Sequence, residues 1–208
     1  MKILCIGRNY AAHAAELGNA KPDQPMVFMK PGSAILPNNK PFYYPEYSKD
    51  VHYEVEVVIN IAKNGRHVAP PFAMDYVDSI GLGLDLTARD LQQKCKENGH
   101  PWEIAKAFDH SAPLSPDFYP PSDFTDLNDI EFSLEKNGQE VQHGHSRNMI
   151  FSLTELICYV SKFFRLQKGD LLFTGTPEGV GSLAVGDELV GYLFTKGGKQ
   201  RMFRTQVK

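Results

Sequence analysis

The first candidate for chemistry is a pair of glutamates, Glu54 and Glu56, separated by a single valine. They lie in the run 51–61, VHYEVEVVINI, whose composition and alternation predict a β-strand. Because residues i and i+2 of a strand point to the same face, the two carboxylates are expected side by side, roughly 6.5–7 Å apart along the strand. Carboxylates that face a core repel each other and lose solvation, and a hard divalent cation is the usual remedy. The alternative is that both form the solvent face of an amphipathic strand.

A third carboxylate, Asp85, follows the apolar, glycine-containing run 79–84, SIGLGL, and precedes a predicted helix. The end of a strand often carries binding groups. An aspartate at this place is, by itself, more often a capping or turn residue. Together with the two glutamates it would complete three oxygen ligands. Three carboxylates leave coordination positions for water or a bidentate substrate, as Mg²⁺ sites usually do.

A histidine and a glutamate, His13 and Glu16, are spaced i, i+3 on a predicted short helix and therefore share one of its faces. A carboxylate that orients an imidazole allows it to activate water. Arg8, just before this helix, could bind an anion. The alternative is an exposed surface pair beside an ordinary solvated arginine.

Polar residues near Asp85 form the next group. Arg89 and Gln92 are also spaced i, i+3, so they line one side of the predicted helix 87–97. Lys106 lies in an apolar stretch, between Ala105 and Ala107. It is a candidate for a buried cation that faces a carboxylate ligand, although most lysines lie at the surface.

The glycine-rich segment 175–181, GTPEGVG, lacks the GK[ST] ending of a phosphate-binding loop, which excludes nucleotide binding by that motif. Such a loop can still present backbone N–H groups and the hydroxyls of Thr174 and Thr176 to an oxyanion. The pair His143 and His145 suggests a metal, but two histidines without a third partner nearby are more typical of a surface.

The elements that must position these residues are mostly strands. The pattern predicts one long helix after Ser152, which forms a capping box with Glu155, and a hairpin through Asn137–Gly138. There is no regular βαβ alternation, so we expect a mixed α+β, β-dominated single domain spanning residues 1–208. Strands are predicted at 2–7, 26–30, 51–61, 79–84, 130–136, 139–141, 171–174, 188–194 and 201–207, helices at 10–17, 72–78 and 87–97, and a loop at 111–128.

Composition excludes several classes of function. The 208 residues include 22 Lys and Arg against 25 Asp and Glu, a net charge of −3, without the basic stripe that a nucleic-acid-binding protein needs. No apolar run approaches the ~20 residues that span a membrane, and the apolar stretch at the N-terminus is too short for a signal peptide. Three widely separated cysteines make a disulfide framework or cysteine zinc site improbable, so we expect a cytoplasmic protein.

Taken together, these residues resemble the fumarylacetoacetate hydrolase family in its short, single-domain form. The resemblance extends over roughly residues 3–194, and the acylpyruvate hydrolase and oxaloacetate decarboxylase members are the most similar. Seven segments match in order: GRNYAAHAAE, FMKPGSAI, HYEVEVVI, GLDLTARDLQ, AKAFDHSAP, MIFSLTELICYVS and LLFTGTPEGVG.

The resemblance implies a mixed β-roll wrapped around a central metal site, usually in a homodimer. The metal carboxylates of the family match Glu54, Glu56 and Asp85, and the metal is usually Mg²⁺ or Mn²⁺. The remaining functional positions of the family match His13 and Glu16 in a lid that orders over bound ligand, Lys106 as the active-site lysine, and Arg89, Gln92 and Thr176 as substrate contacts.

Two segments depart from the family pattern. The chain has Lys106-Ala107-Phe108-Asp109 where the family often has Lys-Gly-Phe-Asp. It has Gly144-His145-Ser146 where the family often has Gly-Asn-Thr, a change that bears on substrate selection or on the dimer surface.

The main hypothesis is a metal-dependent hydrolase that cleaves a C–C bond in acylpyruvate-type 1,3-dicarbonyl substrates through a metal-bound enolate. In it, Glu16 orients His13, which deprotonates water, while Lys106 and the glycine-rich loop offset the charge of the oxyanion. An oxaloacetate decarboxylase or keto–enol tautomerase, or an isomerase of a hydroxymuconate-like or 2-hydroxyhepta-2,4-diene-1,7-dioate-type diacid, would use the same site. A different class is a fold relative that binds a metal or dicarboxylate without catalysis.

Overall fold

The computed structural model describes residues 1–16, 21–37 and 40–208. The α-helices are α1 (Ala11–Glu16), α2 (Arg89–Asn98), α3 (Glu103–Lys106) and α4 (Leu153–Phe163), with 3₁₀ turns at Gly32–Ala34, Pro70–Tyr76, Pro121–Asp123 and Ser146–Asn148. The strands are β1 (Ile3–Gly7), β2 (Met26–Lys30), β3 (Ile35–Leu36), β4 (Val51–Tyr53), β5 (Val55–Ile61), β6 (Val77–Leu84), β7 (Thr87–Ala88), β8 (Ala112–Pro113), β9 (Glu131–Lys136), β10 (Gln139–His145), β11 (Leu171–Phe173), β12 (Gly181–Ser182), β13 (Glu188–Thr195) and β14 (Gly198–Gln206).

The strands form two main sheets and two small ones. The larger sheet has the order β2-β1-β11-β5-β6, in which only β1 and β11 are parallel. A four-stranded antiparallel sheet has the order β10-β9-β13-β14, and β12-β4-β7 and β3-β8 form the small sheets. This mixed, strand-dominated architecture confirms the predicted fold class.

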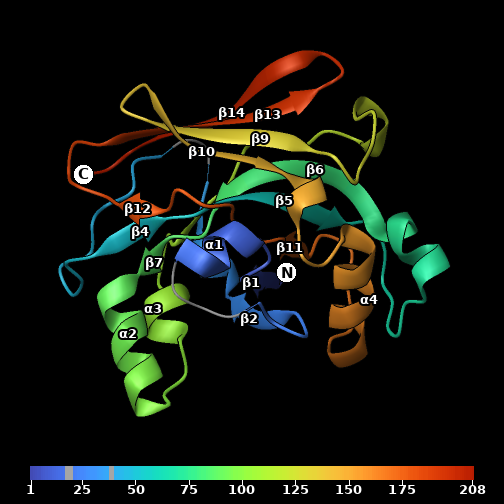
Figure 1. The fold of residues 1–208 in the computed structure, drawn as a ribbon, viewed down its shortest axis with the longest axis horizontal. Coiled ribbons are helices and arrows are strands. Elements are labelled where there is room, and N and C mark those ends of the chain that lie inside the picture. The colour runs from blue at the N-terminus through green and yellow to red at the C-terminus, as the bar shows by residue number, and fades with distance from the viewer. Residues whose placement is uncertain (17–20, 38–39) are drawn as a thin grey trace.

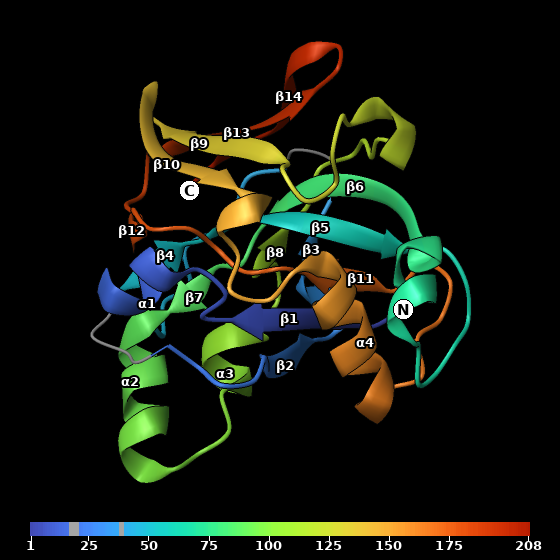
Figure 2. The ribbon, with the colours of Figure 1, turned by 45° about the vertical axis from the view of Figure 1, so that its right-hand side comes forward.

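The two main sheets pack face to face. The four-stranded sheet lies across β5 and β6 in both views of the ribbon (Figures 1 and 2). Buried side chains of β9 and β13, such as Phe132 and Leu193, join those of β5 and β6, such as Val57 and Leu82, in one hydrophobic core. Removing this apolar surface from water is the main stabilising contribution to the fold.

Helix α4 forms as its sequence predicts. The side chain of Ser152 accepts a hydrogen bond from the Glu155 N–H, and the Glu155 carboxylate accepts one from the Ser152 N–H. Four apolar residues at 3–4 spacing are buried, namely Leu153, Leu156, Ile157 and Val160, whereas Phe163 at the end of the helix is exposed. The buried face packs against the 3₁₀ turn Pro70–Tyr76. Capping satisfies N–H groups that the helix itself leaves unpaired.

A chain corner near the centre of the molecule corrects one expectation. The predicted strand 51–61 is not continuous, because it breaks at Glu54 between β4 and β5. The Val55 N–H donates to the side chain of Gln142 at 2.9 Å, and the Glu54 carbonyl accepts a hydrogen bond from the Asp85 N–H at 2.8 Å. Glu54 lies where the chain passes from the small sheet β12-β4-β7 into the larger sheet, and Asp85 lies where it passes back. The backbones of the two residues are therefore paired at this corner.

The segments on either side of Asp85 have two further local features. Thr87, a residue type that often caps helices, does not cap α2: it lies in β7, its hydroxyl donates to the Asp85 carbonyl, and Ala88 occupies the N-cap position without a side-chain cap. Gly81 and Gly83 allow aromatic rings to approach closely, since an added Cβ would lie 2.7 Å from Phe118 and 2.8 Å from Phe173 respectively.

The helix expected at 72–78 is instead a 3₁₀ helix, Pro70–Tyr76, and β6 begins directly after it at Val77. Several other local predictions are confirmed. Asn137 and Gly138 both have positive φ, as the β9–β10 hairpin turn requires. Gly99 ends α2 in the left-handed conformation. Leu17, Gly18 and Asn19, where the first helix was expected to end, lie outside the described residues.

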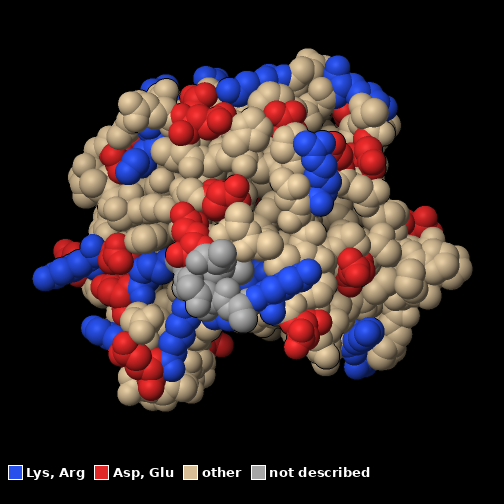
Figure 3. Space-filling view, in the orientation of Figure 1, with Lys and Arg blue, Asp and Glu red and all other residues tan. Residues whose placement is uncertain are grey.

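The surface carries charges of both signs. On the face in Figure 3, basic and acidic side chains are interspersed rather than separated by sign. Among the described residues, no helix is both long enough and apolar enough to cross a membrane.

Candidate active site

Three buried carboxylates meet at the chain corner. Glu54 is 5% exposed, and Glu56 and Asp85 are each 1% exposed. Each offers one oxygen, and these oxygens lie within 4.8 Å of one another. The alternative that the two glutamates form a solvent face is therefore wrong.

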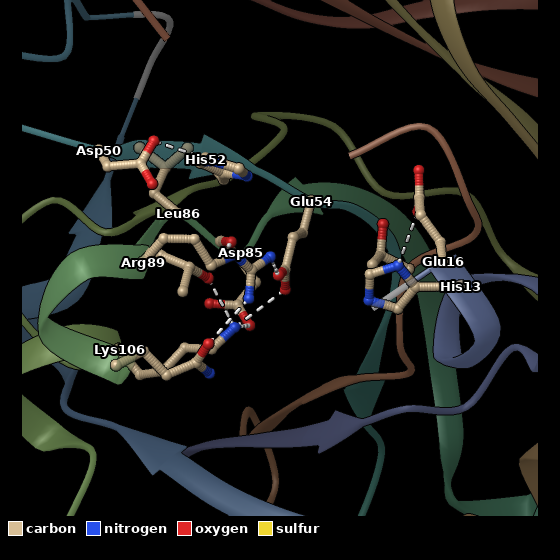
Figure 4. A network of polar contacts seen from close by, with 12 residues as sticks. His13, Glu16, Asp50, His52, Glu54, Asp85, Leu86, Arg89 and Lys106 are labelled. Atoms are coloured by element: carbon tan, nitrogen blue, oxygen red, sulfur yellow. Dashed lines mark hydrogen bonds and ion pairs between the residues drawn. The ribbon is translucent and has the colours of Figure 1, made fainter. Parts of the chain in front are cut away.

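Cations surround two of the three carboxylates (Figure 4). Lys106 Nζ lies 2.9 Å from Glu54 Oε2, 2.6 Å from Asp85 Oδ2 and 2.6 Å from the Thr87 hydroxyl, so its three N–H groups are all engaged. The Arg89 guanidinium donates to the other oxygen of Glu54. Burial raises the pKa of Glu54, but Lys106 and Arg89 outweigh it and hold that pKa well below its usual range.

A second buried lysine, Lys30, completes the charge arrangement. Its Nζ lies 2.8 Å from Asp85 Oδ1 and donates to the Ser111 hydroxyl at 3.0 Å. It also donates to the backbone carbonyl of Lys106, which fixes the segment that carries the other lysine. The side chain is 1% exposed. The sequence analysis missed this residue, whose only signal was a lysine at the end of the apolar run MVFMK.

Glu56 differs from its two neighbours. It accepts a hydrogen bond from the Gly175 N–H at 2.7 Å, but within the described chain no lysine, arginine or histidine pairs with it. Burial first, then the charges of Asp85 and Glu54, raise the pKa of Glu56 well above its usual value. Burying an ionised carboxylate without an ion pair costs free energy. Glu56 therefore lacks the positive charge that would offset this cost.

The donor set fits a divalent metal. Two ligands about 2.1 Å from one ion can be at most about 4.2 Å apart, so the three oxygens need only a small inward shift to share an ion. Carboxylate oxygens are hard ligands, which favours Mg²⁺ or Mn²⁺ over softer metals.

His13 and Glu16 lie to one side of this cluster, on α1 (right in Figure 4). His13 Nδ1 is 3.3 Å from Glu16 Oε2, and the imidazole is 5% exposed while the carboxylate is 37% exposed. The Glu16 carboxylate also accepts from the Gly179 N–H at 3.2 Å. The glutamate thus joins α1 to the glycine-rich loop and orients the imidazole.

A pocket of about 30 Å³ opens beside the carboxylates, between α1 and α2. Arg89 and Gln92 are hydrogen-bonded to each other at 2.9 Å on its wall. Lys96, which the sequence analysis missed, extends this positive wall. Burial, then Arg8 and Arg89, lower the pKa of Lys96, which indicates an excess of positive charge. The polar residues lining the pocket are Arg8, His13, Glu54, Arg89, Gln92, Lys96 and Lys106.

Thr176 does not line this pocket, although the sequence predicted it as a substrate contact. It is 3% exposed, and its hydroxyl accepts a hydrogen bond from Gln142 Nε2 at 2.9 Å. Gln142 also donates to the Pro177 carbonyl at 3.0 Å while accepting from the Val55 N–H. Gln142 therefore joins the strand of the glutamates to the glycine-rich loop.

Asn9 fixes the start of the same loop. Its side chain donates to the Thr174 carbonyl at 2.8 Å and accepts from the Phe151 N–H at 2.8 Å. Gly175, with φ of 103°, passes so close that an added Cβ would lie 2.7 Å from Asn9 Cβ. Neither Asn9 nor Gln142 carried a local signal, because both act through segments more than 30 residues away.

Comparison with known families gives one assignment over nearly the whole chain. The family described as fumarylacetoacetate (FAA) hydrolase, C-terminal, matches residues 2–203. Among curated proteins, the chain is 44% identical over 189 residues to the oxaloacetate tautomerase YcgM of Escherichia coli, covering 90% of this chain and 86% of that protein. It is 42% identical over 187 residues to the mitochondrial oxaloacetate tautomerase FAHD1 of Bos taurus, covering 90% of this chain and 84% of that protein.

Solved structures give the same fold. A fumarylacetoacetate isomerase/hydrolase-like protein of Oleispira antarctica superimposes with a TM-score of 0.92 at 42% identity, covering 100% of this chain and 93% of that one. A fumarylpyruvate hydrolase of Pseudomonas aeruginosa, in complex with Mn²⁺ and pyruvate, superimposes with a TM-score of 0.90 at 38% identity, covering 100% of this chain and 89% of that one.

Proposed function

This chain belongs to the fumarylacetoacetate hydrolase family, and on that premise we propose that it is a metal-dependent enzyme that interconverts the keto and enol forms of oxaloacetate or a similar short 2-oxo diacid. One observation carries the proposal: a positively charged pocket opens directly beside three clustered carboxylates. The curated relatives that are 42–44% identical are named oxaloacetate tautomerases, which supports the substrate class.

Glu54, Glu56 and Asp85 would hold the metal, with Mg²⁺ or Mn²⁺ as the natural candidates. When bound, the ion supplies Lewis-acid polarisation of a carbonyl group and offsets negative charge on oxygen. The Mn²⁺ in the fumarylpyruvate hydrolase structure supports an ion of this class.

The cations of the pocket wall would bind the substrate carboxylates. Arg8, Arg89 and Lys96 face the pocket, and their mutual repulsion would be relieved by a doubly charged anion. Gln92 fixes the orientation of the Arg89 guanidinium through its side-chain oxygen. The rest of the wall is apolar, with Met26, Phe28 and Trp102, and limits access of water.

His13 would move the proton. A carboxylate accepts hydrogen bonds, so Glu16 fixes the tautomer in which Nδ1 of His13 carries the hydrogen and Nε2 is a free base. Nε2 takes the proton from the carbon next to the keto group, the electron pair of the C–H bond forms the C=C bond, and the π pair of the carbonyl moves onto its oxygen to give the enolate. The same proton is returned to oxygen to give the enol, or to carbon to give the keto form.

Lys106 would stabilise the enolate by charge rather than by direct donation, because its N–H groups are engaged by Glu54, Asp85 and Thr87. Its buried ammonium lies in a low-dielectric environment, where a fixed positive charge acts strongly.

Hydrolysis of an acylpyruvate is the second candidate. The His13–Glu16 pair has the geometry to activate water, and the fumarylpyruvate hydrolase structure supports this reaction class. Water attack would need His13 as base, as in tautomerisation, but would break a C–C bond.

The deciding experiment follows oxaloacetate and acetylpyruvate side by side with Mg²⁺, with Mn²⁺ and after chelation. Free metal ions enolise oxaloacetate by themselves, so each rate is compared with metal alone and with Asp85→Asn. An exposed aspartate, Asp75→Asn, is the matched control. We expect rapid, metal-dependent tautomerisation of oxaloacetate that Asp85→Asn abolishes and Asp75→Asn retains. A faster cleavage of acetylpyruvate would favour the hydrolase, and turnover that survives chelation would refute both.

A homodimer and a cytoplasmic location, expected from the sequence and the resemblance, stay predictions. Light scattering on the purified full chain tests the first, and fractionation of the source cell tests the second.

A further inference from the structure

The outer part of β10 carries a second group of potential metal ligands. His143 and His145 point to the same side of the strand, and Glu131 on β9 is the register partner of His145. The three residues each offer one ligand atom, and these atoms lie within 4.8 Å of one another. The third partner that sequence spacing alone did not supply thus comes from the neighbouring strand (Figure 1).

Carboxylates orient both imidazoles. His143 Nδ1 lies 3.1 Å from Glu140 Oε1, and His145 Nδ1 lies 3.0 Å from Asp129 Oδ1. Asp129 is itself held by Arg147 Nη1 at 2.7 Å. Histidines that bind metals almost always donate their other ring N–H to a carboxylate, carbonyl or water, which raises the basicity of the ligating nitrogen.

The rings are also held by stacking. The centroids of His143 and His145 are 5.7 Å apart with planes 26° apart, and Phe194 also stacks on His143 with a centroid distance of 6.1 Å. The side chains of Glu131, His143 and His145 are between 24% and 39% exposed, so an ion can reach them from solvent.

His143 and Glu131 face each other across the position that an ion would take. His143 Nε2 lies 3.0 Å from Glu131 Oε1, so both nitrogens of this ring face carboxylates. An ion between Nε2 and the carboxylate would replace this direct contact.

We propose that Glu131, His143 and His145 form a second metal site, separate from the central carboxylates and selective for a Zn²⁺-like transition metal. Imidazole nitrogens suit Zn²⁺, Cu²⁺ or Ni²⁺, whereas Mg²⁺ prefers oxygen ligands. Three protein ligands leave one tetrahedral position for water. The site crosslinks β9 to β10, and it does not depend on the proposed function, because none of its ligands contacts the pocket.

The test counts Zn²⁺ bound by the full-length protein in equilibrium dialysis against excess Mg²⁺. Asp85→Asn weakens the central site, so the Zn²⁺ that remains reports the outer one. His145→Asn in this background is the decisive variant, because asparagine keeps a polar side chain of moderate size at this half-buried position but lacks the imidazole. His100→Ala, an exposed histidine beyond the end of α2, is the matched control.

We expect one Zn²⁺ per chain in Asp85→Asn and in the control, and none after His145→Asn. Asp129→Asn should weaken binding by about 10–100-fold, the usual effect of removing a partner of a ligating histidine. Binding should also weaken at low pH, because protons compete for His143. Equal Zn²⁺ uptake with and without His145, or no uptake by Asp85→Asn, would overturn the proposal and leave a network of ion pairs.

Discussion

Two groups of three potential metal ligands in this molecule have opposite designs. In the central group, Glu54, Glu56 and Asp85 are at most 5% exposed, and lysines and an arginine pair with two of them. In the outer group, His143 and His145 are partly exposed, and the groups that hold them are carboxylates. At the centre, carboxylates are the ligands and cationic side chains support them. At the outer site, histidines supply two of the ligands and carboxylates support them.

The difference shows what burial demands. Water can solvate the outer group, so protons and ion pairs are enough to satisfy it without a metal. The central group is removed from water, and no lysine, arginine or histidine in the described structure pairs with Glu56, whose pKa is raised. Losing a metal should therefore be costly at the centre and mild outside.

The largest effect is expected from Glu56→Gln, which keeps the shape and the hydrogen bond from Gly175 but removes the charge. Turnover should fall by about 10³-fold, or about 4 kcal/mol, because Lewis-acid stabilisation by the metal is worth several kcal/mol. The metal-free protein should become more stable by about 1–3 kcal/mol, because an ionisable carboxyl group that is buried without a cation is replaced by a neutral amide. Steady-state kinetics and urea unfolding in chelator measure the two changes.

Glu46→Gln, at an exposed glutamate, is the control and should change neither quantity. A loss of stability of Glu56→Gln in chelator would mean that other groups already stabilise the Glu56 carboxylate. That result would contradict the absence of a cationic partner described above.

A smaller effect is expected from Gln142→Ala, which tests whether the two faces of β10 serve different purposes. Loss of the bonds to Val55, Thr176 and Pro177 should lower stability by about 1–3 kcal/mol. Displacement of the glycine-rich loop should reduce kcat by about 10- to 100-fold. The side chain of the neighbouring residue His143 points to the other face of β10. The variant His143→Ala should therefore keep normal turnover. Equal losses of turnover in both variants would show that the faces are coupled.

The smallest effect concerns the pH dependence of stability without metal. Because folding raises the pKa of His143, the folded state binds this proton more tightly than the unfolded state. The stabilisation is complete below the unfolded pKa of about 6.5 and is lost as pH rises through the higher folded value. The side chain is 39% exposed, so we expect only about 0.3–0.5 kcal/mol.

Chelator-treated protein and His143→Ala, unfolded in urea at about pH 6 and about pH 8, test this. The loss of stability between these values should be smaller in His143→Ala, while His100→Ala should behave like the parent protein. A larger loss in His143→Ala would reverse the sign of the argument.

Much of the central site could be predicted from local patterns. The i, i+2 spacing of Glu54 and Glu56, the strand before Asp85 and the i, i+3 spacing of His13 and Glu16 are short-range features, and each places side chains on a common face. The capping box at Ser152 and the Asn137–Gly138 turn are equally local. Most of these patterns survive folding because they depend on the geometry of a single element. Glu54 and Glu56 are the exception: the strand breaks at Glu54, and the two carboxylates still meet at the corner that the Asp85–Glu54 backbone hydrogen bond holds.

The remaining features required the tertiary structure. Lys30 reaches Asp85 only in the folded chain, since β2 and β6 form opposite edges of the larger sheet. Gln142 reaches Val55 because the two main sheets pack together. The break at Glu54 follows from a hydrogen bond to a side chain 87 residues away. Glu131 joins the two histidines only through the register of β9 with β10. The sequence by itself determined which groups could do chemistry, whereas strand order and sheet packing decided their partners, because those contacts join segments far apart in the chain.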